Sequence, residues 1–265
     1  MKVTSASKLS RTKNWRIVIY GKPGVGKTSS VKFLKGKTLV LSLDNSQRVL
    51  SGLPNVDVWK DPDLPEEEDE LSFDREHPSD SIVKFMRDEK EICDNYDNLV
   101  IDNVSSFQKD WFVEQGRKSK NGIRNEIGDY SSWTNYFARI ITSIYLFRNI
   151  NILVTAWEGV EEVTADSGQS FQRYTPELRD SVRDGFLGLS NIVGRVVINP
   201  STGGHGVILE GNDTVFAKNQ IDTRKSSAIE DLFKFGGEAS EPSDRQPAVR
   251  SVDHDETAVP KSKQS

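Results

Sequence analysis

The segment Gly21–Thr28 reads G-K-P-G-V-G-K-T, the complete pattern of a phosphate-binding P-loop. An apolar run, Arg16–Tyr20, precedes it and is typical of a short buried strand, while the run Thr28–Leu34 after it is compatible with a helix. Such a loop binds phosphate where it joins a strand to a helix, because its backbone N–H groups and the helix N-terminus then converge on the anion. The chain meets this condition, so the motif predicts a nucleoside triphosphate site.

The motif also assigns roles to individual residues. Lys27 is expected to reach the β- and γ-phosphates, and the hydroxyl of Thr28 is suited to bind Mg²⁺. We therefore expect ATP, or a similar triphosphate, with Mg²⁺ as the ligands. The predicted nucleotide-binding residues of this segment are Gly21, Lys22, Pro23, Gly24, Val25, Gly26, Lys27, Thr28 and Ser29.

A P-loop site needs an acid at the end of a neighbouring strand to hold Mg²⁺ through water. Asp102 fits best, because it follows the apolar residues Leu99, Val100 and Ile101. Asp44 is the rival, since it also ends an apolar run, and its position suits a catalytic role better. A carboxylate near the γ-phosphate is expected to activate water. For that role the sequence leaves Asp44, Asp61, Asp63 and Glu158 as alternatives.

The net charge of −5 is unevenly distributed. Residues 61–76 hold nine acids and one base, and residues 236–265 hold six acids and four bases. Taking these contributions of −8 and −2 out of −5 leaves +5 on the rest of the chain. The overall acidity therefore does not exclude a nucleic-acid partner.

Strands that alternate with helices predict an α/β fold, a mostly parallel sheet with helices on both faces and an antiparallel edge. We expect a flexible arm at 1–14, one ATPase domain at 15–235 and a disordered tail at 236–265, where Ser, Pro, Gly and charged residues dominate. The expected strands are 16–20, 38–44, 56–59, 98–102, 151–157, a hairpin of 161–164 with 170–174, and 193–199, 206–210 and 214–218. The expected helices are 79–93, 133–145 and 228–235.

The sequence lacks an apolar run long enough for a membrane span and the apolar stretch of a signal peptide. It has one cysteine, Cys93, so no disulfide can form within the chain. We expect an intracellular, cytoplasmic protein.

Five segments together resemble the RecA-like ATPase core. They are the P-loop and the runs L-V-L-S-L-D, N-L-V-I-D-N-V-S-S-F, N-I-L-V-T-A-W-E and V-F-A-K-N-Q. In detail they resemble short phage-encoded P-loop proteins of that type, some of which act in single-strand annealing or recombination. The resemblance covers roughly residues 15–235. It implies a sensor position at Thr155 and a contact from Lys218 to the γ-phosphate of a neighbouring subunit.

RecA-like proteins bind single-stranded DNA through loops after the metal strand and after the sensor strand. The first such region here is 115–124, which contains four bases, no acid and two glycines. A flexible, basic loop suits contact with a phosphate backbone. The second region runs from Phe171 to Arg183 and places aromatic residues beside arginines. The expected DNA-binding residues are Arg117, Lys118, Lys120, Arg124 and Arg173.

Three functions are compatible with these features. The first is a Mg²⁺-dependent ATPase that acts on single-stranded DNA in recombination or replication, as a homo-oligomeric ring or filament with a single-strand-binding or replication protein as partner. The second is an ATPase of the loader type that acts on another protein. The third is a small-molecule kinase, which is disfavoured because the sequence has no arginine-rich lid.

Overall fold

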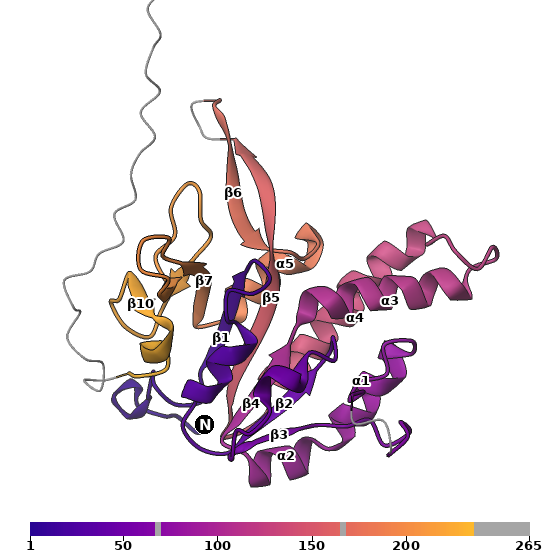
Figure 1. The fold of residues 1–265 in the computed structure, drawn as a ribbon, viewed down its shortest axis with the longest axis horizontal. Helices are drawn as coiled ribbons and strands as arrows, with labels where there is room; N and C mark the ends of the chain where they lie inside the picture. Colours follow the sequence, from indigo (N-terminus) through magenta and orange to yellow (C-terminus); the bar gives the residue numbers. More distant parts are fainter. Residues whose placement is uncertain (67–69, 165–167, 236–265) are drawn as a thin grey trace, which may run out of the picture.

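The structure is a computed structural model that describes residues 1–66, 70–164 and 168–235. Its described residues form a ten-stranded sheet (Figure 1). The strands are β1 (Arg16–Gly21), β2 (Thr38–Ser42), β3 (Val56–Val58), β4 (Asn98–Asp102), β5 (Asn151–Thr164), β6 (Ser170–Pro176), β7 (Ile192–Ile198), β8 (His205–Ile208), β9 (Lys218–Asn219) and β10 (Ser226–Ala228). The helices are α1 (Pro78–Arg87), α2 (Glu89–Asn95), α3 (Val104–Lys118), α4 (Ile127–Tyr145) and α5 (Asp180–Leu189), with 3₁₀ helices η1 (Ala6–Lys8), η2 (Thr28–Phe33), η3 (Gln47–Leu50) and η4 (Ile229–Asp231).

The strand order is β10-β8-β7-β1-β5-β4-β2-β3, with β6 paired to β5 and β9 paired to β7. The six strands from β7 to β3 in this order run parallel, and β6, β8, β9 and β10 are antiparallel to their neighbours. This is the expected α/β architecture, a mostly parallel sheet with an antiparallel edge. The parallel strands bring the ends of β1, β4 and β2 to one edge of the sheet, and β5 separates β1 from β4.

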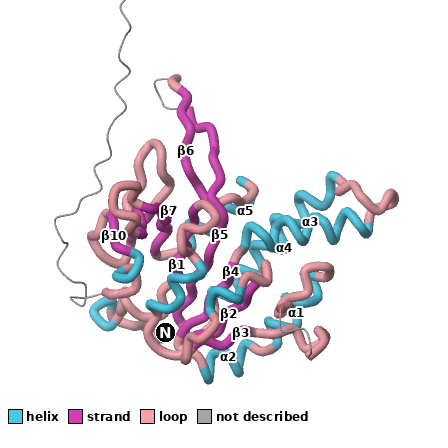
Figure 2. The backbone as a smooth tube through the Cα atoms, viewed as in Figure 1, coloured by secondary structure: helices cyan, strands magenta, loops and turns pink. Residues whose placement is uncertain are grey.

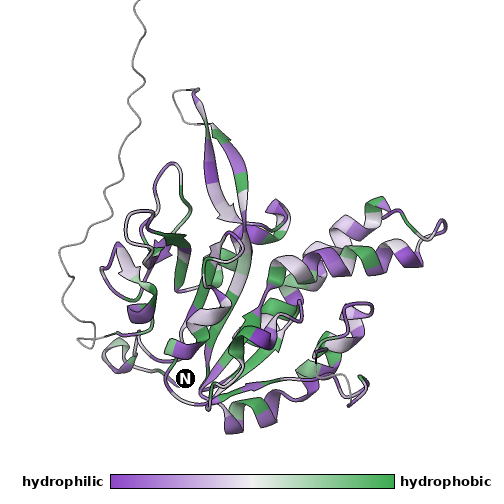
Figure 3. Cartoon of the chain, viewed as in Figure 1, coloured by the Kyte–Doolittle hydropathy of each residue, from purple (hydrophilic) through white to green (hydrophobic). Residues whose placement is uncertain are grey.

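Both faces of the central strands β1, β2 and β4 are buried, which explains why these strands are almost continuously apolar (Figure 3). Along β1, Val18 and Tyr20 join the core beneath the α-helices, whereas Ile17 and Ile19 join the core on the opposite face. The second core is closed by η2, η4 and an aromatic stack of Trp15 on Phe233, with ring centroids 5.7 Å apart. Among the described residues, no helix combines the length and apolar character of a membrane span.

Two hairpins project from this body (Figure 2). One is the helical hairpin of α3 and α4, whose tip is the connection 119–126. The other is the two-stranded ribbon formed by the outer part of β5 with β6, paired from Glu158 with Pro176 to Thr164 with Ser170. These two projections are the places where the predicted nucleic-acid contacts fall.

Several sequence-based boundaries were wrong. The helix predicted for 79–93 is broken at Asp88, which ends α1 and precedes α2. The helix predicted for 228–235 is only the three-residue η4, and the strand predicted for 214–218 is reduced to a bridge at Val215 and the short β9. The run after the P-loop forms a 3₁₀ helix. Helices α3 and α5 were not predicted.

The structure describes the expected N-terminal arm but not the expected C-terminal tail. All of residues 1–14 are exposed, and they contain only the short η1. The tail predicted for 236–265, and the turn residues Asp166 and Ser167, lie outside the described residues.

Candidate functional site

The P-loop leaves the sheet at the carboxyl end of β1, where Gly21 lies opposite Trp157 of β5. A β-carbon at Gly21 would come within 2.7 Å of the carbonyl oxygen of Val196 and 2.9 Å of the Val25 side chain. Only glycine fits this approach of loop and strand. Gly24 and Gly26 have φ values of 79° and 92°, in the left-handed region that glycine adopts without strain. The loop can therefore curl so that its N–H groups face an anion.

Lys27 lies inside this curl. It is 8% exposed, and its Nζ donates hydrogen bonds to the carbonyls of Gly21 at 2.8 Å and Lys22 at 2.9 Å. Burial lowers the pKa of Lys27, and the charges of Asp102, Glu158 and Asp44 act in the opposite direction. The P-loop ammonium thus faces the same acids that the sequence singled out.

Asp102 is the centre of the site, and the structure brings two other predicted residues, Thr28 and Thr155, to its carboxylate. The Thr28 hydroxyl donates to Asp102 Oδ2 at 2.7 Å, and the Thr155 hydroxyl donates to Asp102 Oδ1. The sheet explains the second contact, because β4 and β5 pair in parallel up to Ile101 and Val154, the residues just before Asp102 and Thr155. Ser46, which was not predicted, donates to Oδ2 from 3.4 Å.

The carboxylate of Asp102 is 2% exposed. Burial raises its pKa, and the negative charge of Asp44 raises it further, against the effect of the hydroxyl donors and Lys27. An ionised acid in such a place is stabilised by a nearby cation. The Thr28 and Thr155 hydroxyls and Lys27 therefore do not fully offset the buried negative charge of Asp102.

Asn103 joins Asp44 to this centre and was missed in the sequence. Its Nδ2 donates to Asp44 Oδ2 at 2.7 Å, while its Oδ1 accepts from the backbone N–H of Ser106 and caps the N-terminus of α3. An Asn directly after the predicted metal-binding aspartate and before a helix was the signal that could have revealed it. Arg75 was also missed; its Nη2 donates to Ser106 Oγ at 3.3 Å, and Asp110 holds its guanidinium by two hydrogen bonds.

The donors present fit Mg²⁺. This ion prefers oxygen ligands, keeps several waters, and is usually held by one or two carboxylates together with substrate phosphates. Thr28 and Asp102 offer a hydroxyl and a carboxylate oxygen side by side, and a divalent cation would offset the charge of Asp102 and Asp44. Within the described ranges no cluster of three or more His, Cys, Asp or Glu could hold a metal by itself. Phosphate oxygens and water would therefore complete the coordination.

The four alternatives for the catalytic base lie in different surroundings. Asp44 lies beside Asn103 and Ser46, within the site. Glu158 follows Trp157 at the end of the core part of β5, but Arg195 neutralises it at 2.8 Å. Asp61 and Asp63 both pair with Lys84 of α1, at 2.8 Å and 2.6 Å. Asp44 is the alternative whose carboxylate is linked directly to the residue after Asp102.

Lys218 lies away from this edge. On β9 it pairs with Val193, near the start of β7, and its Nζ donates to the carbonyls of Leu187 and Gly188 at the C-terminal end of α5. A lysine at a helix C-terminus satisfies free carbonyls and the helix dipole. The contact of Lys218 with a neighbouring subunit stays a prediction.

The first predicted DNA-binding region is the tip of the α3–α4 hairpin. Its expectation as a loop was partly wrong, because α3 continues to Lys118. Lys118 pairs with the buried Glu114 at 2.9 Å, and Arg117 donates to the carbonyl of Glu76 at 3.1 Å. Lys120 and Arg124 are exposed, and their side chains pair with no other described residue. Two isoleucines, Ile123 and Ile127, are 83% and 91% exposed at the same tip.

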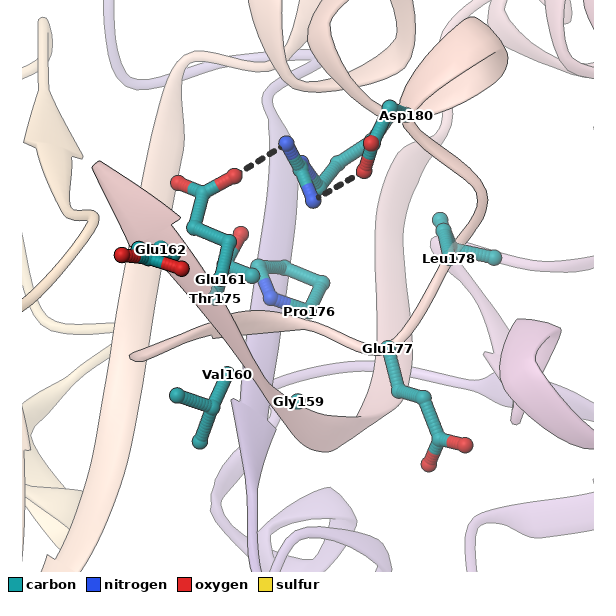
Figure 4. A pocket seen from close by; sticks show the side chains of 10 residues that line it. Gly159, Val160, Glu161, Glu162, Thr175, Pro176, Glu177, Leu178 and Asp180 are labelled. Carbon is teal, nitrogen blue, oxygen red and sulfur yellow. Dashed lines mark hydrogen bonds and ion pairs between the residues drawn. The ribbon is translucent and has the colours of Figure 1, made fainter. Parts of the chain in front are cut away.

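The second predicted region is not a loop. Arg173 is on β6, and Arg183, which is 7% exposed, is on α5. Both arginines bind Glu161 of β5, and Arg183 also pairs with Asp180 at 2.8 Å. Glu161 and Asp180, labelled in Figure 4, line a small pocket at the base of the ribbon together with Arg183, which pairs with both. The guanidinium of Arg173, which was expected to contact DNA, thus already forms an ion pair within the protein, with Glu161.

Comparisons with known proteins bear on this site. A family described as "AAA domain" matches residues 13–221. No curated protein matches the sequence. Among solved structures, the flagellar accessory protein FlaH from Methanocaldococcus jannaschii is 13% identical, with a TM-score of 0.37 over 81% of this chain and 84% of that chain.

Proposed function

Since this chain belongs to the AAA domain family and carries its P-loop, we propose that it is a Mg²⁺-dependent ATPase that acts on single-stranded DNA. The role would lie in phage recombination or replication, as its resemblance to phage-encoded RecA-like proteins suggests. The observation that carries the proposal is the position of the basic hairpin tip at the far end of a helix that begins in the nucleotide site.

The link between site and tip is α3. The helix starts directly after Asn103, which binds Asp44, and ends at Lys118. Its 15 residues span roughly 22 Å at the ordinary rise of an α-helix. A shift of its first turn on nucleotide binding would be carried to the tip by a rigid element. We therefore expect ATP to strengthen DNA binding.

The charge at the tip supports DNA as the ligand. Lys120 and Arg124 are exposed and unpaired among the described residues, and Arg117 uses only a carbonyl contact. Such cations release counterions when they bind phosphates, which makes binding depend on salt. Removing one cation that binds a phosphate lowers the salt slope of log affinity by about 0.7 for a single strand.

The test is a fluorescence titration of a labelled single strand across a salt series, with and without a non-hydrolysable ATP analogue. The variant replaces Arg117, Lys118, Lys120 and Arg124 by Ala. We expect weaker binding and a salt slope reduced by about 1–3, with nucleotide affinity unchanged.

A matched control removes the same amount of positive charge at exposed lysines elsewhere: Lys8, Lys32, Lys90 and Lys225. It should keep the wild-type slope. Equal losses in both variants would show that only net charge matters. Wild-type protein that binds no DNA would favour the loader-type function instead, for which the exposed Ile123 and Ile127 offer an apolar contact surface.

A further inference from the structure

His205 lies against the outside of the P-loop, although it is 180 residues away from Val25 in the sequence. Its Nδ1 is 2.7 Å from the carbonyl oxygen of Val25. Because a carbonyl only accepts, Nδ1 carries the hydrogen and donates it. The ring also covers Gly26, where a β-carbon would come within 3.2 Å of Nδ1 and 3.5 Å of Cε1.

We propose that His205 is a positioning residue for nucleotide binding, which aims the N–H of Gly26 at a bound phosphate. A trans peptide is planar, so its C=O and N–H point in opposite directions. When His205 holds the Val25 oxygen on the outer side of the loop, the Gly26 N–H of the same peptide must face the inner side. The class of ligand is the polyphosphate of a nucleoside di- or triphosphate.

The Gly26 N–H is free for this task. In the described part of the chain it donates to no protein acceptor, whereas the carbonyl of Gly26 accepts from Ser30. A peptide group whose N–H lacks a protein partner gains a charge-assisted hydrogen bond when phosphate arrives. Fixing its direction beforehand reduces the ordering that binding would otherwise require.

The sheet holds His205 in place. It begins β8 and pairs with Ile198 at the end of β7. The connection between them is closed by hydrogen bonds of 2.8 Å from Asn199 to Gly204 and from Gly203 to Asn199. Since β7 is also paired to β1, the histidine and the P-loop are carried by the same rigid unit.

The role of His205 concerns nucleotide binding alone and does not depend on whether the protein binds DNA. The test uses the full chain and two variants, His205→Ala and His205→Asn. The amide of asparagine can place a donor close to the position of Nδ1, so it should restore the contact that alanine removes. The probe is a fluorescent ADP analogue, displaced by unlabelled ADP or ATP.

We expect His205→Ala to weaken the binding of ADP and ATP by about three- to tenfold, the effect of removing one hydrogen bond. His205→Asn should recover most of that affinity. In hydrolysis, KM should rise with kcat almost unchanged, because this hydrogen bond acts equally in ground and transition states. Melting without nucleotide should not change, because His205 is exposed. His77→Ala, an exposed histidine paired with Asp74, is the control.

Wild-type affinity in His205→Ala would overturn the proposal. The proposal would also be overturned if His205→Ala lost affinity, His205→Asn did not recover it, and the nucleotide-free protein melted at a lower temperature. That pattern belongs to a residue needed only for folding. Since no arm of the experiment contains DNA, its result is independent of the DNA titrations.

Discussion

The replacement Asp102→Asn should make the metal-free protein more stable while it strongly slows hydrolysis. Asp102 is 2% exposed, and burial with the charge of Asp44 raises its pKa. An asparagine keeps the volume and an oxygen that can accept from Thr28 or Thr155. It removes the buried charge, which is useful only when Mg²⁺ is bound.

The size of the effect follows from two opposing contributions. Replacing a buried ion pair by neutral groups of similar volume is often stabilising, by about 1–4 kcal/mol, and we expect the removal of this one buried charge to act in the same direction. Against this, the hydroxyl donors lose charge-assisted hydrogen bonds, each worth about 1.5–3 kcal/mol with an ionised partner. Because the amide oxygen keeps part of that interaction, we expect a net gain of about 1–2 kcal/mol. For a domain of this size it corresponds to a rise of about 2–8 °C in melting temperature.

The dependence on pH gives an internal check. A carboxyl whose folded pKa lies above its unfolded value destabilises the fold when ionised, so wild-type stability recovers as the pH falls through the raised pKa toward 3.8. The advantage of Asp102→Asn should be largest at alkaline pH and should shrink on acidification. The assay is thermal or urea unfolding in EDTA from about pH 8.5 to about pH 4, a range that extends down toward the ordinary carboxyl value of 3.8.

Hydrolysis provides the second half of the experiment. With Mg²⁺ and ATP, the variant should lose about a hundredfold or more in turnover, as expected when one electrostatic interaction is removed. Asp44→Asn is the comparison, because Asp44 is less buried and is held by Asn103. A variant that is less stable than wild type without metal, at every pH, would refute the reasoning about the buried charge. A larger loss of turnover in Asp44→Asn, with little in Asp102→Asn, would show that Asp44 is the metal acid.

Other changes test the rest of the domain. Lys27→Ala should abolish ATP hydrolysis, because its buried ammonium is the charge nearest the expected phosphates; turnover at the wild-type rate would contradict the P-loop assignment. A chain that ends at Phe235 should fold and bind nucleotide, since it keeps the stack of Trp15 on Phe233, and circular dichroism with nucleotide titration would check this. Trp133→Ala should cost about 3–5 kcal/mol in urea unfolding, because Trp133 is fully buried among aromatic rings; a destabilisation below about 1 kcal/mol would argue against that packing.

The sequence predicted the parallel sheet well, because strands buried on both faces leave an apolar signature. The run 98–102 was predicted with the same boundaries as β4. The boundaries of the helices were predicted less well. Asp88 could not be identified as the end of α1, since the apolar periodicity continues across it. Helix α5 was hidden among charged residues that were interpreted as a DNA-binding loop.

Within the site, the predictable residues were those that belong to a contiguous motif or end an apolar strand. Lys27, Thr28 and Asp102 came from such patterns, and Thr155 came from the resemblance. Residues that reach the site from elsewhere left no local pattern. His205 lies on an antiparallel strand beyond β7, and only the three-dimensional pairing of β1, β7 and β8 reveals that it contacts the P-loop.

The site is built so that nucleotide contacts and helix position depend on the same residues. Asn103 caps α3 with the oxygen of its amide and binds Asp44 with the nitrogen. A movement of Asp44 therefore affects the first turn of α3, and a movement of that turn affects Asp44. Asp102, directly before it, binds the P-loop hydroxyl of Thr28. A ligand that draws Asp102 or Asp44 toward a cation must therefore act on the first turn of α3. Because the connection that follows the opposite end of that helix carries the exposed Lys120 and Arg124, we propose that the same arrangement serves either a DNA strand or a protein partner, and the salt titrations distinguish the two.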